Sequence, residues 1–271
     1  MAVTSGLGGA VNGFDTVRGW RVVESDAGPE FVASNSDGMQ ASLAGNKDWT
    51  GSIELYGYAP AFLPGEALTF AGWNGTSRAT GDALVESVAL NCDIEAGGVI
   101  NHTLQIAGNG ALSKNTTSVT DSGVPSAYTS IGCKASFDAA GGSSYTDIDD
   151  VRTWSLNIAC SLQPYVSSGT AGVVKRTAGP LSGTASLSVY QGTVGSLPSV
   201  GTIGSLRLYV SATAYYQLLY ARVMSIEPAA DIEGGGNNGA TIQYAYSGFK
   251  RIAGTMTKGS ITKPDTTVYW N

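Results

Sequence analysis

The sequence repeats itself at a fixed spacing, and this repeat restricts the possible folds more than any other feature. The segment DIEAGGVINHTLQIAGNG, Asp93–Gly110, aligns without gaps to DIEGGGNNGATIQYAYSG, Asp231–Gly248, at an offset of 138. Nine of the eighteen positions are identical, where about one is expected from composition. A chain of this kind is predicted to build the same structural unit twice. The identical pairs are Asp93/Asp231, Ile94/Ile232, Glu95/Glu233, Gly97/Gly235, Gly98/Gly236, Thr103/Thr241, Gln105/Gln243, Ala107/Ala245 and Gly110/Gly248.

Weaker matches extend the repeat towards the start of each unit. Val17–Trp20 aligns to Val151–Trp154 at an offset of 134, and Gly51-Ser52 aligns to Gly183-Thr184 at 132. The changing offset indicates loops of different length between retained strands. Further matches at 138 are Leu68/Leu206, Val85/Val223, Ser87/Ser225 and Val88/Ile226. We therefore divide the chain into an N-terminal arm (1–16), a first unit (17–112), a connector (113–150), a second unit (151–253) and a C-terminal arm (254–271).

The composition indicates that each unit is made of strands. Hydrophobic residues make up 42% of the chain but charged residues only 13%, against about a quarter in ordinary globular proteins, and the 37 glycines are about twice the usual share. Long amphipathic helices need more Glu, Lys and Arg on their wet face. We predict an all-β fold of two tandem β-sandwich or barrel domains. In the first unit, strands are expected at Val17–Val23, Ser52–Tyr56, Ala67–Trp73, Leu84–Asp93 and Ile100–Ala107.

Periodicity leaves one alternative open, because Leu84–Cys92 and Tyr216–Met224 would also fit a helix. Glycine tolerates positive φ, so the segments 95–98 and 233–236 are predicted to be turns of long hairpins. Gly234–Gly239 matches the pattern G-x-G-x-x-G, which binds a dinucleotide only where it opens a helix after a strand. In a hairpin turn it predicts no cofactor.

The candidate catalytic groups do not form a recognisable active site. His102 is the sole histidine and Ala240 replaces it in the second unit, which excludes a His-pair metal site; we expect a surface or hydrogen-bonded strand histidine. The pairs Asp93/Glu95 and Asp231/Glu233 occur in both units and could act as general acid and base, although solvated turn residues are the simpler interpretation.

Three further groups are candidates for binding. Asp147, Asp149 and Asp150 lack the spacing of a calcium loop, and a solvated connector explains them. Cys92, Cys133 and Cys160 are an odd number at spacings that suit no metal site or disulfide framework, so buried thiols are expected. Trp20 and Trp154 are shared and predicted to be buried, which leaves Trp49, Trp73 and Trp270 for interfaces or sugar stacking. We predict no catalytic, cofactor-binding or metal residues, and no enzyme.

Charge differs in sign between the two units. The first unit holds 11 acidic and 4 basic residues, whereas the second holds 3 acidic and 7 basic. Copies packed head to tail would place each acidic unit beside basic neighbours. Lys175, Arg176 and Arg207 are the basic residues expected to matter. The net charge of −6 argues against attraction to nucleic acid, and no apolar run near the start or elsewhere predicts a leader or a membrane span.

The order of these motifs resembles the tail tube proteins of long-tailed bacteriophages. The resemblance rests on VRGW at Val17–Trp20, DWTGSIELYGYAP at Asp48–Pro60, PGEALTF at Pro64–Phe70 and the DIEAGG hairpin that follows them. It implies a small β-sandwich or barrel whose inner sheet joins those of neighbouring subunits around a hollow tube. With two units per chain it implies trimeric rings of pseudo-sixfold symmetry.

The resemblance also implies partners and a location. Stacked rings would conduct DNA through the lumen without specific binding, in a virion tail made in the host bacterial cytoplasm, with tape measure, terminator and distal tail proteins as neighbours and no membrane. Segments Glu24–Asn46, Ser113–Asp150 and Thr255–Asn271 are candidates for locking ring to ring. Two alternatives stay open: another virion component such as a capsid decoration protein, or a carbohydrate-binding β-sandwich module. A β-sandwich hydrolase lacks a catalytic constellation.

Overall fold

The fold is built from strands and turns, as the composition predicts. In the computed structural model, the described residues contain no α-helix and one short 3-10 turn, η2 (Ser168–Thr170). Fifteen strands form a single sheet in which all strand pairs are antiparallel. The helical alternative is wrong, because both ambiguous segments lie within long strands. The described ranges are 9–14, 16–32, 39–58, 60–119, 129–141, 144–190, 197–230, 238–252 and 255–264.

The two units contain the same strands in the same spatial order. In the first unit the order across the sheet is β6-β7-β8-β5-β2, and in the second it is β14-β15-β16-β13-β12. When the five long strands of each unit are numbered along the chain, their spatial order in both units is third, fourth, fifth, second, first. The strands of the first unit are β2 (Val17–Ala27), β5 (Asn46–Tyr56), β6 (Ala67–Trp73), β7 (Arg78–Asp93) and β8 (Asn101–Gly108). Those of the second are β12 (Val151–Tyr165), β13 (Lys175–Tyr190), β14 (Ile203–Tyr209), β15 (Tyr215–Ala229) and β16 (Gly239–Tyr246).

Register irregularities recur at the aligned positions. The β7–β8 ladder shifts between Val85 and Ser87, and the β15–β16 ladder shifts between their aligned counterparts, Val223 and Ser225. The β2–β5 and β12–β13 ladders both shift around the aligned arginines, Arg18 and Arg152. Because a bulge re-aims the strand that carries it, its repetition gives the two units the same local bend. A common origin of the units stays a prediction.

The pairing corrects two of the sequence alignments. Ser52 lies opposite Gln105, and the residue opposite the aligned Gln243 is Ser186, not Thr184, so the offset here is 134 rather than 132. Leu68 lies opposite Ala83 whereas Leu206 lies opposite Leu218, so these two leucines are not equivalent either. Short sequence matches in a serine- and glycine-rich strand do not specify register, whereas backbone pairing does.

Short strands tie the arms and the connector to the sheet. From the connector, β9 (Ser113–Asn115) pairs with β7, while β10 (Ala135–Asp138) pairs with β11 (Thr146–Ile148) and β14. The N-terminal β1 (Ala10–Val11) pairs with β6, and β19 (Ile261–Thr262) pairs with β15. Two small hairpins stand outside the main sheet: β3 (Glu30–Phe31) with β4 (Ala41–Ser42), and β17 (Phe249–Ile252) with β18 (Thr255–Lys258).

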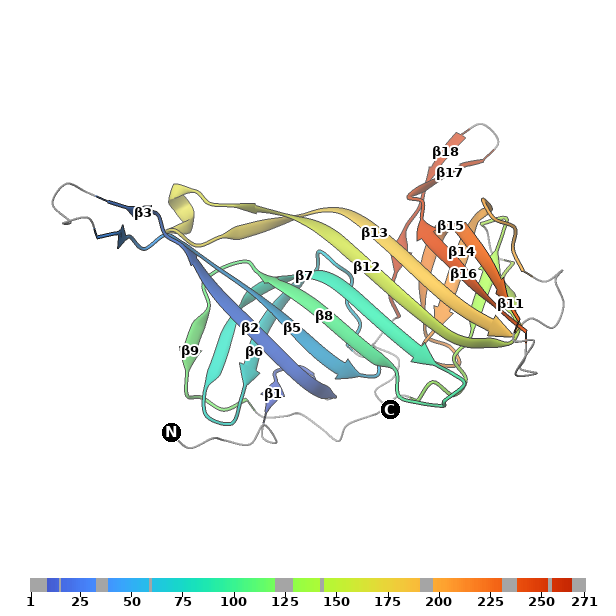
Figure 1. The fold of residues 1–271 in the computed structure, drawn as a ribbon, viewed down its shortest axis with the longest axis horizontal. Coiled ribbons are helices and arrows are strands. Elements are labelled where there is room, and N and C mark those ends of the chain that lie inside the picture. Colours follow the sequence, from blue (N-terminus) through green and yellow to red (C-terminus); the bar gives the residue numbers. More distant parts are fainter. Residues whose placement is uncertain are drawn as a thin grey trace.

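The sheet spans both units without a break, and its two ends curl into lobes (Figure 1). The long β12–β13 hairpin starts in the second unit and reaches across to the first, and the β3 and β17–β18 hairpins project away from the body. These projections include part of Glu24–Asn46 and Thr255–Asn271, the segments predicted to connect rings. Among the described residues, no helix is long and apolar enough to cross a membrane.

The two faces of the sheet differ in chemistry, because successive side chains of a strand point to opposite faces. One cross-strand row is apolar except for a histidine and is buried: Leu55, His102, Leu90, Leu156, Ala185, Tyr244 and Val223. The row beside it on the opposite face is polar, uncharged and at least partly exposed: Asn101, Asn91, Ser155, Ser186, Gln243 and Ser225. The core thus lies under one face, and the other presents amide and hydroxyl groups to solvent.

Candidate assembly interface

The two units are joined within the chain by direct strand pairing. Seven consecutive pairs connect β12 to β7, from Thr153 opposite Asp93 to Ala159 opposite Ser87. The ladder continues past Asp93, where Ile94 N–H donates to the Arg152 carbonyl at 2.8 Å. Alternate backbone groups of a strand point to opposite sides, so Trp154, Leu156 and Ile158 direct theirs towards β7. The first strand of the second unit therefore serves as an edge partner for the fourth strand of the first.

A carboxylate clamp closes one end of this junction. Glu95, in the β7–β8 turn, accepts hydrogen bonds from Arg152 Nε at 2.7 Å and from the Tyr190 hydroxyl at 2.5 Å. Arg152 also stacks over the Tyr190 ring, 4.5 Å from its centroid. The hydrogen bonds from Tyr190 and Arg152 lower the pKa of Glu95. The clamp joins the first unit to the second, because Glu95 belongs to one and its two partners to the other.

The strands that correspond to the two sides of this junction, β2 in the first unit and β15 in the second, each have an unpaired edge. Among the described residues, β2 pairs only with β5, and Ser225–Ala229 of β15 pair only with β16. Gly65 N–H donates to the Val85 carbonyl and Gly201 N–H to the Val223 carbonyl. The segment before the third long strand therefore contacts the fourth long strand at the same aligned residue in both units. Beyond that point β12 covers the first unit's strand, whereas the second unit's strand is left open. Unpaired edges of this length attract another strand.

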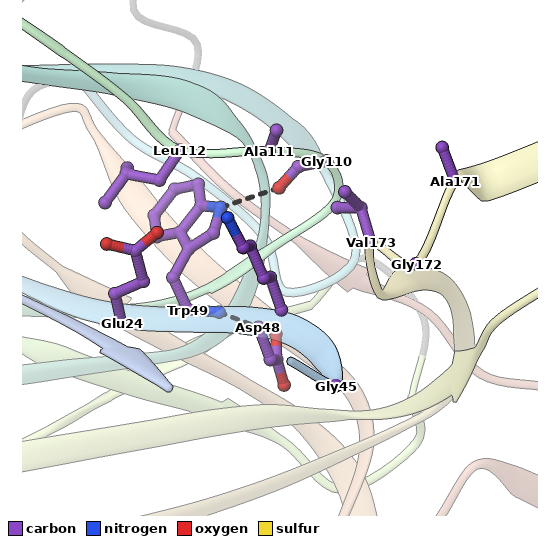
Figure 2. Close-up of a pocket in the computed structure, with 11 residues that line it drawn as sticks. Glu24, Gly45, Asp48, Trp49, Gly110, Ala111, Leu112, Ala171, Gly172 and Val173 are labelled. Carbon is purple, nitrogen blue, oxygen red and sulfur yellow. Dashed lines mark hydrogen bonds between the residues drawn. The ribbon is translucent and has the colours of Figure 1, made fainter. Parts of the chain in front are cut away.

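The tip of the β12–β13 hairpin docks onto the first unit beside the largest aromatic residue of β5. Lys47 N–H donates to the Gly172 carbonyl at 2.9 Å, and Val174 N–H donates back to Lys47 at 3.0 Å. A pocket of about 240 Å³ lies between this tip and β5. Figure 2 shows the Trp49 indole inside it, with Nε1 donating to the Gly110 carbonyl at 2.8 Å. Trp49 is 2% exposed, so its assignment to interfaces or sugar stacking is wrong.

A nearly buried ion pair fixes the same contact. Arg176 donates to the two carboxylate oxygens of Asp48 at 2.8 and 2.5 Å, and also to the Gly108 carbonyl. Its side chain is only 9% exposed. Arg207 is likewise occupied within the chain, stacked on Tyr145 and Tyr215 with its guanidinium 3.6 and 4.4 Å from their ring centroids. Arg176 is therefore not free to contact a neighbouring copy, whereas the importance of Lys175 and Arg207 for assembly stays a prediction.

His102 is neither at the surface nor hydrogen-bonded. It is 1% exposed, and neither ring nitrogen has a partner among the described residues. Its position in the apolar row, between Leu55 and Leu90, directs the ring into the core. Burial lowers its pKa from 6.5 to about 4.

This histidine predicts a pH-dependent stability. The unfolded chain binds a proton at His102 below about pH 6.5, but the folded chain binds one only below about pH 4, so stability is full above pH 6.5 and falls as the pH drops to 4. We expect about 3 kcal/mol less stability at pH 4 than at pH 7 from this group alone. Urea unfolding across this range should show a shallower pH dependence for His102→Gln than for the native chain. Identical slopes would contradict the prediction.

Among the described residues, the acidic side chains singled out in the sequence make turn and surface contacts. Asp93 accepts a hydrogen bond from Ala96 N–H in the turn, where Gly97 has the predicted positive φ of 61°. Asp147 pairs with Lys134 at 2.8 Å, and Asp149 and Asp150 are exposed, as expected for a solvated connector. The described residues contain no group of three metal-binding side chains. The positions 231–237, which include Asp231, Glu233 and most of the glycine motif, lie outside the described residues.

The cysteines and the other described tryptophans lie in or beside the core. All three thiols are buried and free, as predicted, and the hydrogen bond with Cys133 together with burial raises the pKa of Cys92. Trp154 is buried, while Trp20 is half-buried, stacks edge-on against Phe70 and donates to the Trp73 carbonyl at 3.2 Å. Trp270 lies outside the described residues.

Sequence reasoning missed the clamp residues. Arg152 belongs to a segment that aligns between the units, where its partner is Arg18. Tyr190 and Tyr56 lie outside the segments that align by sequence. The signal was present, because both units carry an arginine at the bulge and a tyrosine at the end of the next strand, and both pairs share the offset of 134.

Comparisons with known proteins add a structural likeness. No family model matches the sequence, and no curated protein matches it. A chain of the tail of an empty GTA particle, determined by helical refinement with C6 symmetry, is similar over 48% of this chain and 96% of its own, at 13% identity and a TM-score of 0.31. A likeness of that size has no bearing on function, and the functional argument depends on the strand geometry.

Proposed function

We propose that this chain is a structural protein, not an enzyme, which assembles head to tail into closed rings that stack as the tube of a phage tail. The observation that supports the proposal is the internal β7–β12 junction together with the two corresponding edges left open at β2 and β15. A head-to-tail contact of this kind closes into a ring when its rotation allows, and forms a filament otherwise. With two units per chain, three chains would give six junctions of one type.

The polar face of the sheet supports a role in the passage of DNA. Its central cross-strand row consists of Asn, Ser and Gln side chains, with no Lys or Arg. Attraction to phosphate requires basic groups, so a lumen lined by this central row would let DNA slide, while the exposed Arg21 and Arg222 lie towards the two sides of the same face. The projecting β3–β4 and β17–β18 hairpins, together with the connector, are the proposed contacts between rings and with other tail proteins.

Negative-stain electron microscopy of the purified chain tests this function. Rings or hollow tubes are expected. Monomers that bind a glycan would instead favour a carbohydrate-binding module, and association only with separately supplied capsids would favour a decoration protein. Either of these results would overturn the proposal.

A further inference from the structure

The open edge of β2 carries an unfinished copy of the carboxylate clamp. In the first unit, Arg18 and Tyr56 occupy the positions that Arg152 and Tyr190 occupy in the second. The Arg18 guanidinium likewise lies over the Tyr56 ring, 5.8 Å from its centroid. In the second unit this pair holds Glu95. In the first unit Arg18 has only a long contact of 4.0 Å with Glu54, and both of these side chains are more than half exposed.

From this we propose that the junction between two copies reproduces the internal β7–β12 junction residue for residue, and that Arg18 and Tyr56 receive a carboxylate from the second copy. This inference rests on the proposed head-to-tail assembly. When the internal register is transferred to the aligned positions of β2 and β15, Trp20–Ser25 of one copy pairs with Ser225–Ala230 of the next. Arg21 then lies opposite Ala229, as Ser155 lies opposite Asn91.

The carboxylate proposed for the clamp is chosen by sequence alignment alone. The residue aligned with Glu95 is Glu233, which lies outside the described residues. The backbone of the open edge is also suitably directed. A Cβ added to Gly51 would lie 2.7 Å from the Arg21 carbonyl, so the backbone groups of Arg21 point towards β5. The backbone groups of the alternate residues Trp20, Val22 and Glu24 therefore point to the unpaired side of β2.

The charge balance favours the same contact. The edge that receives the strand belongs to the basic second unit, while the strand it receives belongs to the acidic first unit. The register of this contact is specified by the strands, because a slip of one residue would place every side chain on the wrong face.

A cysteine cross-link tests the register. Arg21→Cys combined with Ala229→Cys should form an intermolecular disulfide under mild oxidation of the assembled protein, whereas Arg21→Cys combined with Pro228→Cys should not. The positive control is Ser155→Cys with Asn91→Cys, which should cross-link within one chain. The three native cysteines are buried and should contribute little background.

A charge exchange tests the clamp. Arg18→Glu and Glu233→Arg should each weaken association at least tenfold, measured by analytical ultracentrifugation at low salt, and the double variant should recover most of the loss. The native chain could assemble while the 21/229 pair fails to cross-link, or while the double variant associates no more tightly than the single ones. Either result would contradict the proposed junction but not the proposed ring. If the native chain does not self-associate at any concentration, both proposals fail.

Discussion

The Glu24→Pro substitution is expected to leave the chain folded but to prevent its assembly. The backbone N–H of Glu24 faces the open side of β2, so proline removes no hydrogen bond to β5 and its ring blocks an incoming strand. Losing that bond and stranding its acceptor should cost about 3 kcal/mol per junction, or roughly 100-fold in affinity. A three-chain ring would incur this cost at three junctions.

The control for this variant is Glu24→Ala. It keeps the N–H but removes the 2.6 Å ion pair between Glu24 and Lys114, which the proline also removes. Glu24→Ala should assemble like the native chain, as seen by size-exclusion chromatography with light scattering, while Glu24→Pro elutes as a monomer. The thermal unfolding midpoint of Glu24→Pro should equal that of the native chain at concentrations where the native chain is not assembled. Assembly of both variants would show that the edge of β2 is not the interface.

The Asp48→Ala substitution is expected to reduce the free energy of unfolding by about 3 kcal/mol. It would strand the guanidinium of Arg176, which is 9% exposed and keeps only the Gly108 carbonyl and solvent as partners. The value is at the lower end for a broken buried pair because the Asp48 side chain is 29% exposed. The tip of the β12–β13 hairpin should also become more accessible to protease.

Two variants separate this effect from a general loss of charge. Asp48→Ala combined with Arg176→Met should be more stable than Asp48→Ala alone, because no unpaired charge stays buried. Lys114→Ala removes a solvent-exposed pair and should change stability by less than about 1 kcal/mol. Equal stability of Asp48→Ala and Lys114→Ala in urea unfolding would contradict the role assigned to this pair.

The all-β fold could be predicted from the sequence because two signals agreed. Low charge with abundant glycine excluded amphipathic helices, and the repeat located the β7–β8 hairpin together with its glycine turn. Strand ends were less predictable: β5 begins at Asn46 rather than Ser52, and β7 at Arg78 rather than Leu84. These extensions are polar strand segments without clean alternation, and they are held by pairing with distant strands that a local pattern does not contain.

The candidate interface could be predicted only in part. The proposed head-to-tail arrangement was expected from the duplication and the charge asymmetry, but one of the basic residues expected to matter, Arg176, is occupied within the chain. Arg176 finds its counter-ion in Asp48, far away in the sequence, and Arg207 is stacked between two tyrosines from different segments. Which charge is used within the chain and which stays free depends on tertiary contacts. The open edges of β2 and β15 likewise become visible only once the internal junction is known.

The most direct test of self-assembly through these edges is the mass of the native particle. Mass photometry or native mass spectrometry of the purified chain over a range of concentrations should give three times the 27.7 kDa chain and multiples of that mass. Glu24→Pro at the same concentrations should give a single chain. A native protein that stays at 27.7 kDa, or one whose oligomers are unaffected by Glu24→Pro, would contradict assembly through these two edges.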